Sequence, residues 1–579
     1  MTPNGESFRL VGPVGVLEAN RIDEVAPTIA AAEAATARGL WVGGVVSYEA
    51  APGLDPALTA RRATPEDPFS RFPLAWFAMF EGREATSLPD PPDLGRGSND
   101  AWLPTSDHAS YDAALATIRE RIAAGETYQV NHTIRLRSRV EGDERGLYRD
   151  LCYAQRGAHA AFLNMGRYRV LSASPELFFE IDGRRLTTRP MKGTAPRGRW
   201  PAEDRAVRAG LVGSVKDRAE NAMIVDLLRN DLGRVARNGT VTWSDVFDPE
   251  RFETVWQLTT TVSCQLRADV GLLDVFLALF PSGSVTGAPK VGTMRIIEEL
   301  ETQPRNAYCG AVGFLAPEGS GVPTARFNVA IRTVVVDGET GAAEYGVGGG
   351  ITWDSRAPGE YDEIVAKARV LTTRRPRFEL LETLRAEGGM IRSLDRHLSR
   401  LLSSADYFGF AADDSELRKA LQAEAGLPHD QPTRLRLVLD RRGRFTITSS
   451  PFPPAADTVR VALDTTEPVD PAEPMLFHKT TLRRRYEEAK ARHPDVEDVV
   501  LTNVRGEVTE ATIANVAARI DDRWWTPPLD SGLLPGTARE AMLEDGTLDE
   551  RILTVEEFLA ADEVALVSDA RGWRTADVR

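Results

Sequence analysis

The stretch "ARFNVAIRTVVVDGETGAAEYGVGGGITWD" (residues 325–354) contains two strand-like runs rich in β-branched and aromatic residues. Similar runs occur earlier, at residues 127–140 and 168–182, whereas helical spacing appears in only a few places, such as residues 111–126 and 214–236. Strands and helices therefore do not alternate one for one. This order predicts an α+β fold built on layered sheets and argues against a doubly wound parallel sheet.

Composition excludes several classes of protein. The chain has 579 residues and a net charge of −15, and it shows no basic stripe, so we expect no nucleic-acid partner. The N-terminus lacks the pattern of a signal peptide, and the longest apolar runs are much shorter than a bilayer span. We therefore expect a cytoplasmic protein without membrane contact. Its three cysteines, Cys152, Cys264 and Cys309, form no CxxC pair, which fits a reducing compartment.

The length indicates more than one domain. A boundary is predicted within "KARVLTTRRPRFELLETLR" (367–385), where a helical pattern ends, arginines and a proline follow, and a new strand begins. We therefore predict an N-terminal module over residues 1–372 and a C-terminal module over residues 378–579.

One lysine lies in an unusual setting. In "LTTRPMKGTAPRG" (186–198), Lys192 stands among prolines and glycines, which predicts a shaped loop after the strand-like residues 177–188. A solvated surface lysine is the simplest interpretation. A lysine in a low-dielectric pocket would instead have a lowered pKa and could act as a nucleophile.

Other polar segments of the first module each have a plain structural alternative. Glu220 follows Lys216 at the spacing of a surface ion pair on a helix. "PSGSVTGAPK" (281–290) could be a loop and a helix start. The glycines at 348–350 could bend a strand, and the glutamates of "GEYDE" (359–363) could form a favourable first helical turn.

Taken together over residues 111–372, these segments resemble the chorismate-utilising enzymes, which include component I of anthranilate and aminodeoxychorismate synthases. Isochorismate and salicylate synthases belong to the same family. The first hundred residues resemble it more weakly. The resemblance implies two large facing sheets with helices outside and the active site between the sheets.

The resemblance also implies roles for single residues. Glu220 and Glu363 match glutamates that bind Mg²⁺, a hard cation that takes oxygen ligands. Arg332 can hold a substrate carboxylate in bidentate fashion. The positions that match the substrate site are Thr286, Tyr308, Arg332, Gly348, Gly349, Gly350 and Lys367.

Lys192 separates the members of this family. "PMKGT" (190–194) resembles the "PIKGT" of aminodeoxychorismate synthases, whereas anthranilate synthases have alanine at this lysine. In that subfamily the lysine attacks ring carbon 2 of chorismate as the 4-hydroxyl leaves, and ammonia then enters at carbon 4. Glu176 matches the general acid for the leaving hydroxyl. Trp256 and Gln257 stand where members often have histidines, so that position is assigned no acid–base role.

Residues 378–579 contain a second set of motifs: "RHLSRLL" (396–402), "FHKTTLRRRYEEA" (477–489), "GEVTEATIANV" (506–516) and "LPGTARE" (534–540). An ordinary amphipathic helix and a surface lysine are the plain alternatives. The order of the motifs resembles class IV pyridoxal-phosphate enzymes, which include branched-chain and D-amino-acid aminotransferases and aminodeoxychorismate lyases. This resemblance implies a smaller α+β domain of PLP fold type IV.

The second resemblance implies a site for pyridoxal 5′-phosphate. Lys479 matches the lysine that carries the cofactor, and Glu510 matches the carboxylate that pairs with the pyridinium nitrogen. Arg400 matches a phosphate ligand. Gly536 and Thr537 match the backbone that caps the phosphate at a helix start.

Together, the two resemblances imply a bifunctional enzyme of 4-aminobenzoate synthesis, in the folate branch. The first module would convert chorismate and ammonia to 4-amino-4-deoxychorismate, and the second would cleave this to 4-aminobenzoate and pyruvate. No cysteine lies in a GxCxG nucleophile elbow, so a separate glutamine amidotransferase subunit would supply the ammonia.

Alternatives remain for both modules. The first could be an anthranilate or isochorismate synthase. The second could be an aminotransferase or a decayed, non-catalytic module, because the usual opening strands of the class IV enzymes are reduced to "FELLETLR" (378–385). The class IV resemblance also allows a homodimer through the C-terminal module.

Overall fold

The computed structural model describes residues 7–88, 101–156, 158–371, 377–427, 431–452, 456 and 458–579. Contacts divide the chain into two compact units: residues 1–196 with 208–376, and residues 197–207 with 377–579. The predicted module boundary falls on residues 372–376, which lie outside the described residues.

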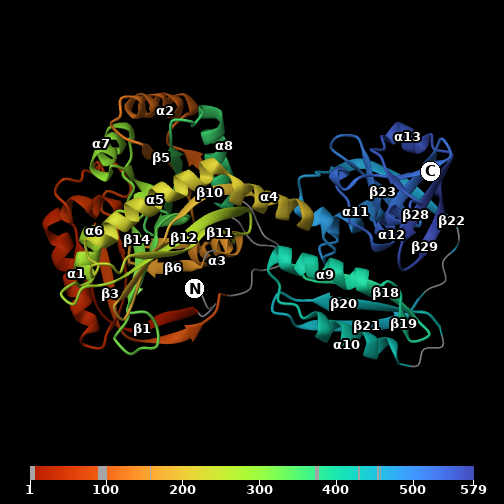
Figure 1. The fold of residues 1–579 in the computed structure, drawn as a ribbon, viewed down its shortest axis with the longest axis horizontal. Coiled ribbons are helices and arrows are strands. Elements are labelled where there is room, and N and C mark those ends of the chain that lie inside the picture. Colours follow the sequence, from red (N-terminus) through yellow and green to blue (C-terminus); the bar gives the residue numbers. More distant parts are fainter. Residues whose placement is uncertain are drawn as a thin grey trace. The chain divides into compact units, whose positions relative to one another are not determined.

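Two antiparallel sheets form the first unit (Figure 1). The larger sheet has ten strands, in the order β1 (Ser7–Ala19), β3 (Ala75–Thr86), β2 (Trp41–Val46), β14 (Ala311–Leu315), β15 (Ala325–Val329), β8 (Leu177–Asp182), β9 (Arg185–Arg189), β12 (Val255–Gln265) and β10 (Met191–Pro196), with β11 (Thr242–Arg251) beside β12. The smaller sheet has seven strands, in the order β13 (Gly287–Ala288), β5 (Gln129–Arg139), β17 (Ala342–Ile351), β16 (Thr333–Asp337), β7 (Tyr168–Ser174) and β6 (His159–Asn164), with β4 (Leu103–Pro104) beside β5.

Helices pack against these sheets, and α5 lies along β10 and β12 (Figure 1). The helices of the unit are α1 (Ile22–Thr36), α2 (His108–Ala123), α3 (Glu144–Gln155), α5 (Val215–Gly233), α6 (Leu272–Leu279), α7 (Lys290–Leu300) and α8 (Ala357–Ala368). The Ser214 hydroxyl caps α5 by accepting a hydrogen bond from the Asp217 amide (3.2 Å). Phe179, Phe276 and Phe327 form part of the core, with ring centroids 5.2–5.3 Å apart. The predicted α+β class is confirmed.

Two runs that read as single strands each divide between the two sheets. Residues 168–182 form β7 and β8, and residues 325–337 form β15 and β16. The two crossings lie side by side: the Val329 amide donates to the Glu176 carbonyl, and the Ala173 amide donates to the Arg332 carbonyl, both at 3.1 Å. Arg332 has φ +52°, a left-handed conformation that is uncommon for a non-glycine residue. The chain therefore turns sharply from one sheet to the other at Glu176 and Arg332.

The second unit also has two sheets. The four-stranded sheet has the order β19 (Met390–Ile391), β18 (Leu380–Glu387), β20 (Thr433–Leu439) and β21 (Phe445–Pro451), and α9 (Leu394–Phe408) and α10 (Asp414–Ala425) pack against it (Figure 1). The eight-stranded sheet has the order β24 (Val508–Ala511), β23 (Asp498–Asn503), β22 (Thr458–Val469), β29 (Gly572–Val578), β28 (Glu563–Ser568), β25 (Asn515–Ile520), β26 (Arg523–Thr526) and β27 (Asp549–Glu550). Its helices are α11 (Arg484–Arg492), α12 (Thr537–Glu544) and α13 (Val555–Leu559).

A short segment from the middle of the sequence completes the second unit. Residues 197–207 belong to it by their contacts, and they include the start of α4 (Pro201–Gly213). In the part of the chain that the structure describes, no helix is long and apolar enough to cross a bilayer.

Candidate active sites

The prediction that Lys192 lies in a loop is wrong, because Lys192 lies in strand β10. Met191 pairs with Thr259 and Thr194 pairs with Gln257, so two residues, Lys192 and Gly193, occupy the space opposite one residue of β12. This is a β-bulge, which changes the local twist and re-aims a side chain. Gly193 has φ +90°, which favours glycine, and this explains why a glycine follows the lysine.

Glu176 lies at the crossing between the sheets and is only 4% exposed. Burial raises the pKa of its carboxyl to about 7, while a hydrogen bond from Ser284 and the charge of Lys192 act in the opposite direction. The Lys192 charge also acts on Glu220 and Glu363, where it opposes the effect of burial on each carboxyl pKa. The structure therefore brings Lys192 together with three of the predicted glutamates.

The glycine run belongs to β17, which pairs with β5 so that Gly349 lies opposite His132. A Cβ atom on Gly350 would lie 2.8 Å from the Lys192 Nζ, and one on Gly349 would lie 3.5 Å from the Lys367 Nζ. The first of these distances is a clash, so a side chain at position 350 would displace the lysine. Both amines thus lie next to the strand backbone, and at position 350 the close approach of Lys192 requires a glycine.

The two predicted metal ligands come from different helices, Glu220 from α5 and Glu363 from α8. Burial raises the pKa of Glu220, and the charge of Glu363 adds to this effect. Each also has a lysine one turn away: Lys216 is 3.9 Å from Glu220, as the surface-pair alternative expected, and Lys367 pairs with Glu363.

The fit of this pair to Mg²⁺ rests on the chemistry of its donors. Within the described ranges, no group of three or more His, Cys, Asp or Glu residues is arranged to hold a metal. Mg²⁺ is commonly held by one or two carboxylates, with water and substrate completing the shell, so two mutually repelling carboxylates fit it. Two more carboxylates act in this area: Asp217, which the sequence analysis did not name, raises the pKa of Glu220, and Glu363 raises that of Glu360, for which a favourable first helical turn was the plain alternative.

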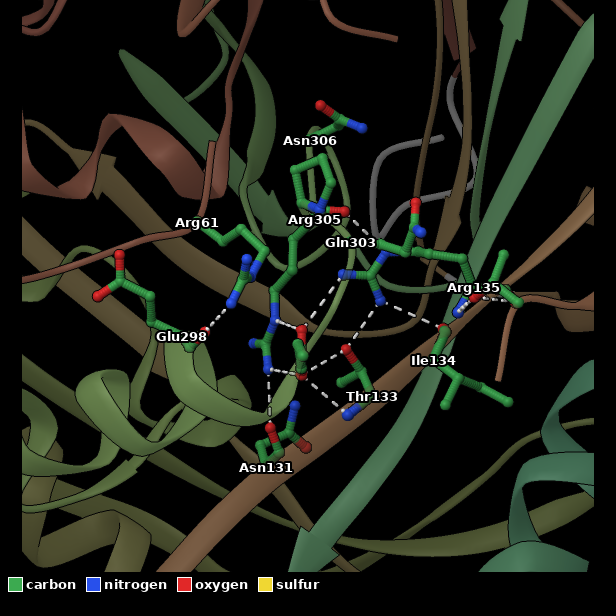
Figure 2. Close-up of polar contacts among 12 residues, drawn as sticks. Arg61, Asn131, Thr133, Ile134, Arg135, Glu298, Gln303, Arg305 and Asn306 are labelled. Carbon is green, nitrogen blue, oxygen red and sulfur yellow. Dashed lines mark hydrogen bonds and ion pairs between the residues drawn. The ribbon is translucent and has the colours of Figure 1, made fainter. Parts of the chain in front are cut away.

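A buried ion cluster holds the elements around the site together (Figure 2). The Glu301 carboxylate accepts from Arg305 (2.6 and 3.0 Å) and Arg135 (3.3 Å), and also from the amide and hydroxyl of Thr133. Arg305 further donates to the carbonyls of Asn131 (2.8 Å) and Val285 (2.7 Å). Burial opposes ionisation of Glu301, but Arg305 outweighs it and the pKa falls to about 2.

This cluster positions two predicted substrate residues. Thr286 follows Val285 directly; its carbonyl accepts the Asn131 amide (2.8 Å) and its hydroxyl donates to the Ser282 carbonyl (3.0 Å). Tyr308 lies three residues after Arg305, and its ring covers Gly346 so closely that a Cβ atom there would be 2.2 Å from it.

Arg332 and Lys367 complete the predicted set. The Arg332 Nε donates to the Gln155 side chain (3.2 Å), and the Lys367 Nζ donates to the Gly348 carbonyl (2.7 Å). Burial lowers the pKa of Lys367; Glu363 opposes this shift and Arg332 adds to it. The arginine and the lysine therefore share one electrostatic environment beside the glycine strand.

Gln129 is a site residue that the sequence analysis missed. It is fully buried, and neither polar atom of its side chain has a hydrogen-bond partner among the described residues. Its Nε2 would lie 2.7 Å from a Cβ on Gly350, the same point that Lys192 approaches. The sequence signal that could have identified Gln129 is an amide side chain within a strand that is expected to be buried, because buried polar groups normally have a hydrogen-bond partner.

The two residues at the histidine position differ in their surroundings. Trp256 is buried, and the Arg208 guanidinium lies 5.7 Å from its ring. The Gln257 Nε2 donates to the Thr194 hydroxyl (3.2 Å), on the same strand as Lys192. Gln257 thus braces the strand that carries the lysine.

Lys479 of the second unit lines a cavity of about 240 Å³ together with Arg400, Gly536 and Thr537. A smaller cavity of about 50 Å³ joins Lys479 to Glu510. Burial lowers the pKa of Lys479 to about 8, and Arg400 adds to this shift while Glu382 opposes it. All five residues that the class IV resemblance assigned therefore line one or other of two cavities that share Lys479.

The other predicted cofactor residues are held by their own contacts. Burial raises the pKa of Glu510 to about 7, and its carboxylate accepts from the Tyr486 hydroxyl (2.8 Å) and the Leu534 amide (3.2 Å). Gly536 caps α12, and a Cβ atom on it would lie 1.9 Å from the Asn515 Oδ1. The helix therefore starts at Thr537, with its backbone amides available to an anion.

Arg400 is more constrained than the sequence suggested. Its Nε and Nη2 bind Glu382 at 2.9 and 2.7 Å, and its Nη1 donates to the Pro535 carbonyl (3.1 Å). Three of its five N–H groups are thus used, which leaves two for a phosphate. His397 binds the same Glu382 at 2.7 Å. The sequence analysis missed Glu382, His397 and the further arginines of the cavity wall, Arg434, Arg436, Arg483 and Arg571.

Comparison with known proteins places the chain in two families. Residues 4–373 match the family described as chorismate binding enzyme, and residues 379–577 match amino-transferase class IV. The chain is 40% identical to an aminodeoxychorismate synthase of Streptomyces griseus over 52% of this chain and 40% of that protein. It is also 40% identical to aminodeoxychorismate synthase component 1 of Salmonella typhimurium, over 46% of this chain and 58% of that protein.

Other relatives carry the name of a different activity. Anthranilate synthase component 1 of Cereibacter sphaeroides is 39% identical over 46% of this chain and 52% of its own length. The solved anthranilate synthase component I of Streptococcus pneumoniae matches the fold with a TM-score of 0.54 and 23% identity, over 64% of this chain and 93% of that one. This chain spans less than two thirds of each of the three sequence relatives. Because the first family match covers more than half of the chain, the protein belongs to the chorismate binding enzyme family, and a class IV amino-transferase domain follows that region.

Proposed function

We propose that residues 1–372 aminate chorismate to 4-amino-4-deoxychorismate and that residues 378–579 cleave this product to 4-aminobenzoate and pyruvate. The observation that carries the first step is that the Lys192 charge acts on the buried Glu176, whose pKa of about 7 leaves it substantially protonated at neutral pH. Similarity to proteins named aminodeoxychorismate synthase supports the same step.

The proposed chemistry balances without an oxidant. The Lys192 amine forms a bond to ring carbon 2, both ring double bonds shift toward carbon 4, and the 4-hydroxyl leaves as water after Glu176 gives it a proton. Ammonia then forms a bond at carbon 4, both double bonds return, and the bond to Lys192 breaks. Chorismate and ammonia thus give 4-amino-4-deoxychorismate and water.

Substrate and metal would occupy the glycine-lined side of this site. Glu220 and Glu363 would hold Mg²⁺, which would neutralise a carboxylate of the dianionic substrate. Arg332 would bind a substrate carboxylate, and the backbone of Gly348, Gly349 and Gly350 would let the ring approach closely.

The test is the identity of the aromatic product. The full chain is incubated with chorismate, Mg²⁺ and an ammonium salt, and products are separated and identified by mass and NMR. We expect the amine para to the carboxylate, and Lys192→Ala should lose product by at least ~10²–10⁴-fold. Lys419→Ala, which removes an exposed lysine of α10, is the control. An ortho product would assign the module to anthranilate synthesis, and near-normal turnover by Lys192→Ala would remove the nucleophile.

For the second step, Lys479, Glu510, Arg400, Gly536 and Thr537 would hold pyridoxal phosphate. When bound, the cofactor supplies an electron sink for the carbon that carries the amine. Lys479, with a pKa of about 8, can take the proton from ring carbon 4 and pass a proton on. The bond between the ring and the enolpyruvyl oxygen breaks, the ring becomes aromatic, and the released enol takes up a proton as pyruvate.

Cofactor attachment tests the second step independently of the first. The protein is incubated with pyridoxal phosphate, treated with borohydride, digested and analysed by mass spectrometry. We expect the cofactor on Lys479, while Lys419, an exposed lysine of α10, stays unmodified. A protein without label at Lys479 that still aminates chorismate would identify the C-terminal module as non-catalytic.

A separate glutamine amidotransferase would supply the ammonia, as the words "component 1" in a relative's name suggest. All three cysteines are buried, and burial raises the pKa of Cys264 and Cys309 to about 11 and that of Cys152 to about 12. Such thiols are poor nucleophiles at neutral pH. The purified chain should therefore use ammonium but not glutamine, and glutamine-dependent product from this chain alone would contradict a separate partner.

A further inference from the structure

We infer that residues 197–204, which follow the Lys192 strand in sequence, are a positioning element for the proposed cofactor lysine, Lys479. The inference rests on the proposed function of the C-terminal module. Its structural basis is that residues 197–207 belong, by their contacts, to the same compact unit as residues 377–579. Four residues of the segment reach the turn that leads into Lys479, by two routes.

The first route runs through Tyr407. The Arg197 guanidinium lies 4.3 Å from the centre of the Tyr407 ring and donates to the Tyr407 carbonyl (3.0 Å). The Tyr407 hydroxyl donates to the Gly198 carbonyl (2.6 Å). The ring then stacks on His478, with centroids 4.5 Å apart, and His478 is bonded to Lys479 through the backbone.

A buried ion pair holds this route in place. Arg197 binds Asp204 through two contacts of 2.7 Å, and the side chains are 5% and 8% exposed. Asp204 also accepts the Gly198 amide (2.9 Å), and a Cβ on Gly198 would lie 2.2 Å from the Asp204 amide nitrogen. Such a paired, bidentate and desolvated contact fixes geometry more strongly than an exposed ion pair does.

The second route runs through Phe477. The Trp200 ring lies 5.0 Å from the Phe477 ring and joins an apolar cluster with Leu476 and Leu501. Arg199 covers Trp200 at 4.5 Å and binds Asp530 at 2.8 Å. The segment thus contacts Phe477 from one side and reaches His478 from another.

His478 has chemistry that depends on this packing. Burial lowers the pKa of its imidazole to about 3, and the Arg199 backbone works in the opposite direction. Ser404 binds its Nδ1 at 2.9 Å. A neutral, stacked ring beside Lys479 keeps the peptide before the lysine fixed, and the lysine backbone is held in turn because its carbonyl accepts the Leu381 amide (2.9 Å).

The experiment uses the full chain, without cofactor, and compares Trp200→Ala, Trp200→Phe and Trp243→Ala. Trp243 is a matched control because it is half exposed, lies in the first unit, and also carries an arginine at 4.5 Å. Hydrogen–deuterium exchange of the peptide over residues 474–482 is measured first. Capture of added pyridoxal phosphate by Lys479 is then followed by absorbance as a function of pH.

We expect Trp200→Ala to accelerate exchange over residues 474–482 roughly two- to tenfold, the range of an aromatic pair. It should also slow cofactor capture and move its pH midpoint, while Trp200→Phe restores both and Trp243→Ala changes neither. Unchanged exchange in a folded Trp200→Ala protein would overturn the inference, as would equal acceleration across all of residues 377–579.

The two failures are distinguishable. If the wild-type chain captures no cofactor, the proposed function of the C-terminal module fails, and the exchange pattern alone decides whether residues 197–204 position the Lys479 turn. Tyr407→Phe provides a second variant, since it removes the hydroxyl that binds Gly198 but keeps the ring on His478. It should give a smaller change in the same peptide, and no change there would count against the first route.

Discussion

The two candidate sites differ in the role proposed for their lysine. Lys192 acts on three glutamates, including Glu176, whose pKa of about 7 matches neutral pH. Burial, with the charges of Arg400 and Arg483, lowers the pKa of Lys479 to about 8, although the charges of Glu382 and Glu510 oppose this shift. In the first site the group prepared to exchange a proton is therefore an acid next to the lysine. In the second it is the lysine itself.

Each of the two sites is supported by a buried carboxylate that lies between two cationic side chains. Glu301 lies between Arg135 and Arg305, and Glu382 lies between Arg400 and His397. Burial opposes ionisation of both carboxylates, but the cations outweigh it and both pKa values fall to about 2. The fold thus uses the same buried clamp twice, and the proposed difference in chemistry arises from the residues placed on it.

Replacing each lysine by arginine gives the largest expected effect. Arginine keeps the positive charge but stays protonated, so it can neither attack a carbon nor move a proton at neutral pH. Lys192→Arg should reduce amination by at least ~10²–10⁴-fold and spare cleavage of supplied aminodeoxychorismate, and Lys479→Arg should do the reverse. Product rates are measured for each step separately, with Lys419→Arg as the control. Loss of both activities in either variant would show that the sites are not independent.

Removal of Mg²⁺ should stop the reaction at the first site and leave the reaction at the second site unchanged. EDTA should abolish amination, because two repelling carboxylates, Glu220 and Glu363, would lose the cation between them. Added Mg²⁺ should restore it, and cleavage of supplied aminodeoxychorismate should not change. Glu220→Gln should weaken Mg²⁺ binding, so that a higher Mg²⁺ concentration is needed for the half-maximal rate. An amination rate that ignores EDTA would remove the metal from the first site.

The clamps predict matched losses of stability. Glu301→Gln leaves Arg135 and Arg305 without a charged partner. Glu382→Gln leaves Arg400 without one, whereas His397 keeps its contact with Asp569 (3.2 Å). Each change should cost about 3–5 kcal/mol of unfolding free energy. Because the folded pKa of about 2 lies below the usual 4.5, this stabilisation is present above pH 4.5 and is lost as the pH falls toward 2. Calorimetry should show one shifted transition per variant. Glu299→Gln, in an exposed pair, should change stability by less than about 1 kcal/mol.

The pH profiles give the smallest effect and the sharpest contrast. Glu176 must be protonated to act as an acid, so amination should fall about tenfold per pH unit above its pKa of about 7. Lys479 must be neutral to capture the cofactor, so capture should rise until about pH 8. Amination is measured at a constant concentration of free ammonia, because ammonia also titrates. Parallel slopes for the two steps would contradict the difference between the sites.

Sequence patterns predicted several elements well. The apolar spacing of residues 111–126 and 214–236 corresponds to α2 and α5, within a few residues at each end. The crossings at Glu176 and Arg332 were not predictable, because apolar strand residues continue on both sides of each and nothing local indicates a change of sheet. The bulge at Lys192 was read as a loop for a related reason: glycine and proline indicate irregular backbone but not its pairing partners.

The sites divide in the same way. Motifs with fixed spacing led to Lys192, Glu176, Lys479 and Glu510, and the structure brings each near the expected neighbours. Gln129 and Glu382 carry no motif of their own, and their roles depend on residues far away in sequence. The contacts of residues 197–207 could not be predicted for the same reason, because their partners lie some two to three hundred residues later in the sequence.

The position of residues 197–207 in the sequence affects how the protein folds during its synthesis. During synthesis, this segment leaves the ribosome roughly 170 residues before Arg377, the next residue of its unit. At about 5–20 residues per second, it waits some ten seconds or more without its partners. Trp200 and the buried Arg197–Asp204 pair would be exposed in that interval. The nascent chain thus carries, directly after the Lys192 strand, a segment whose partners lie in the last third of the polypeptide. A chain released before those residues are made would leave this segment exposed.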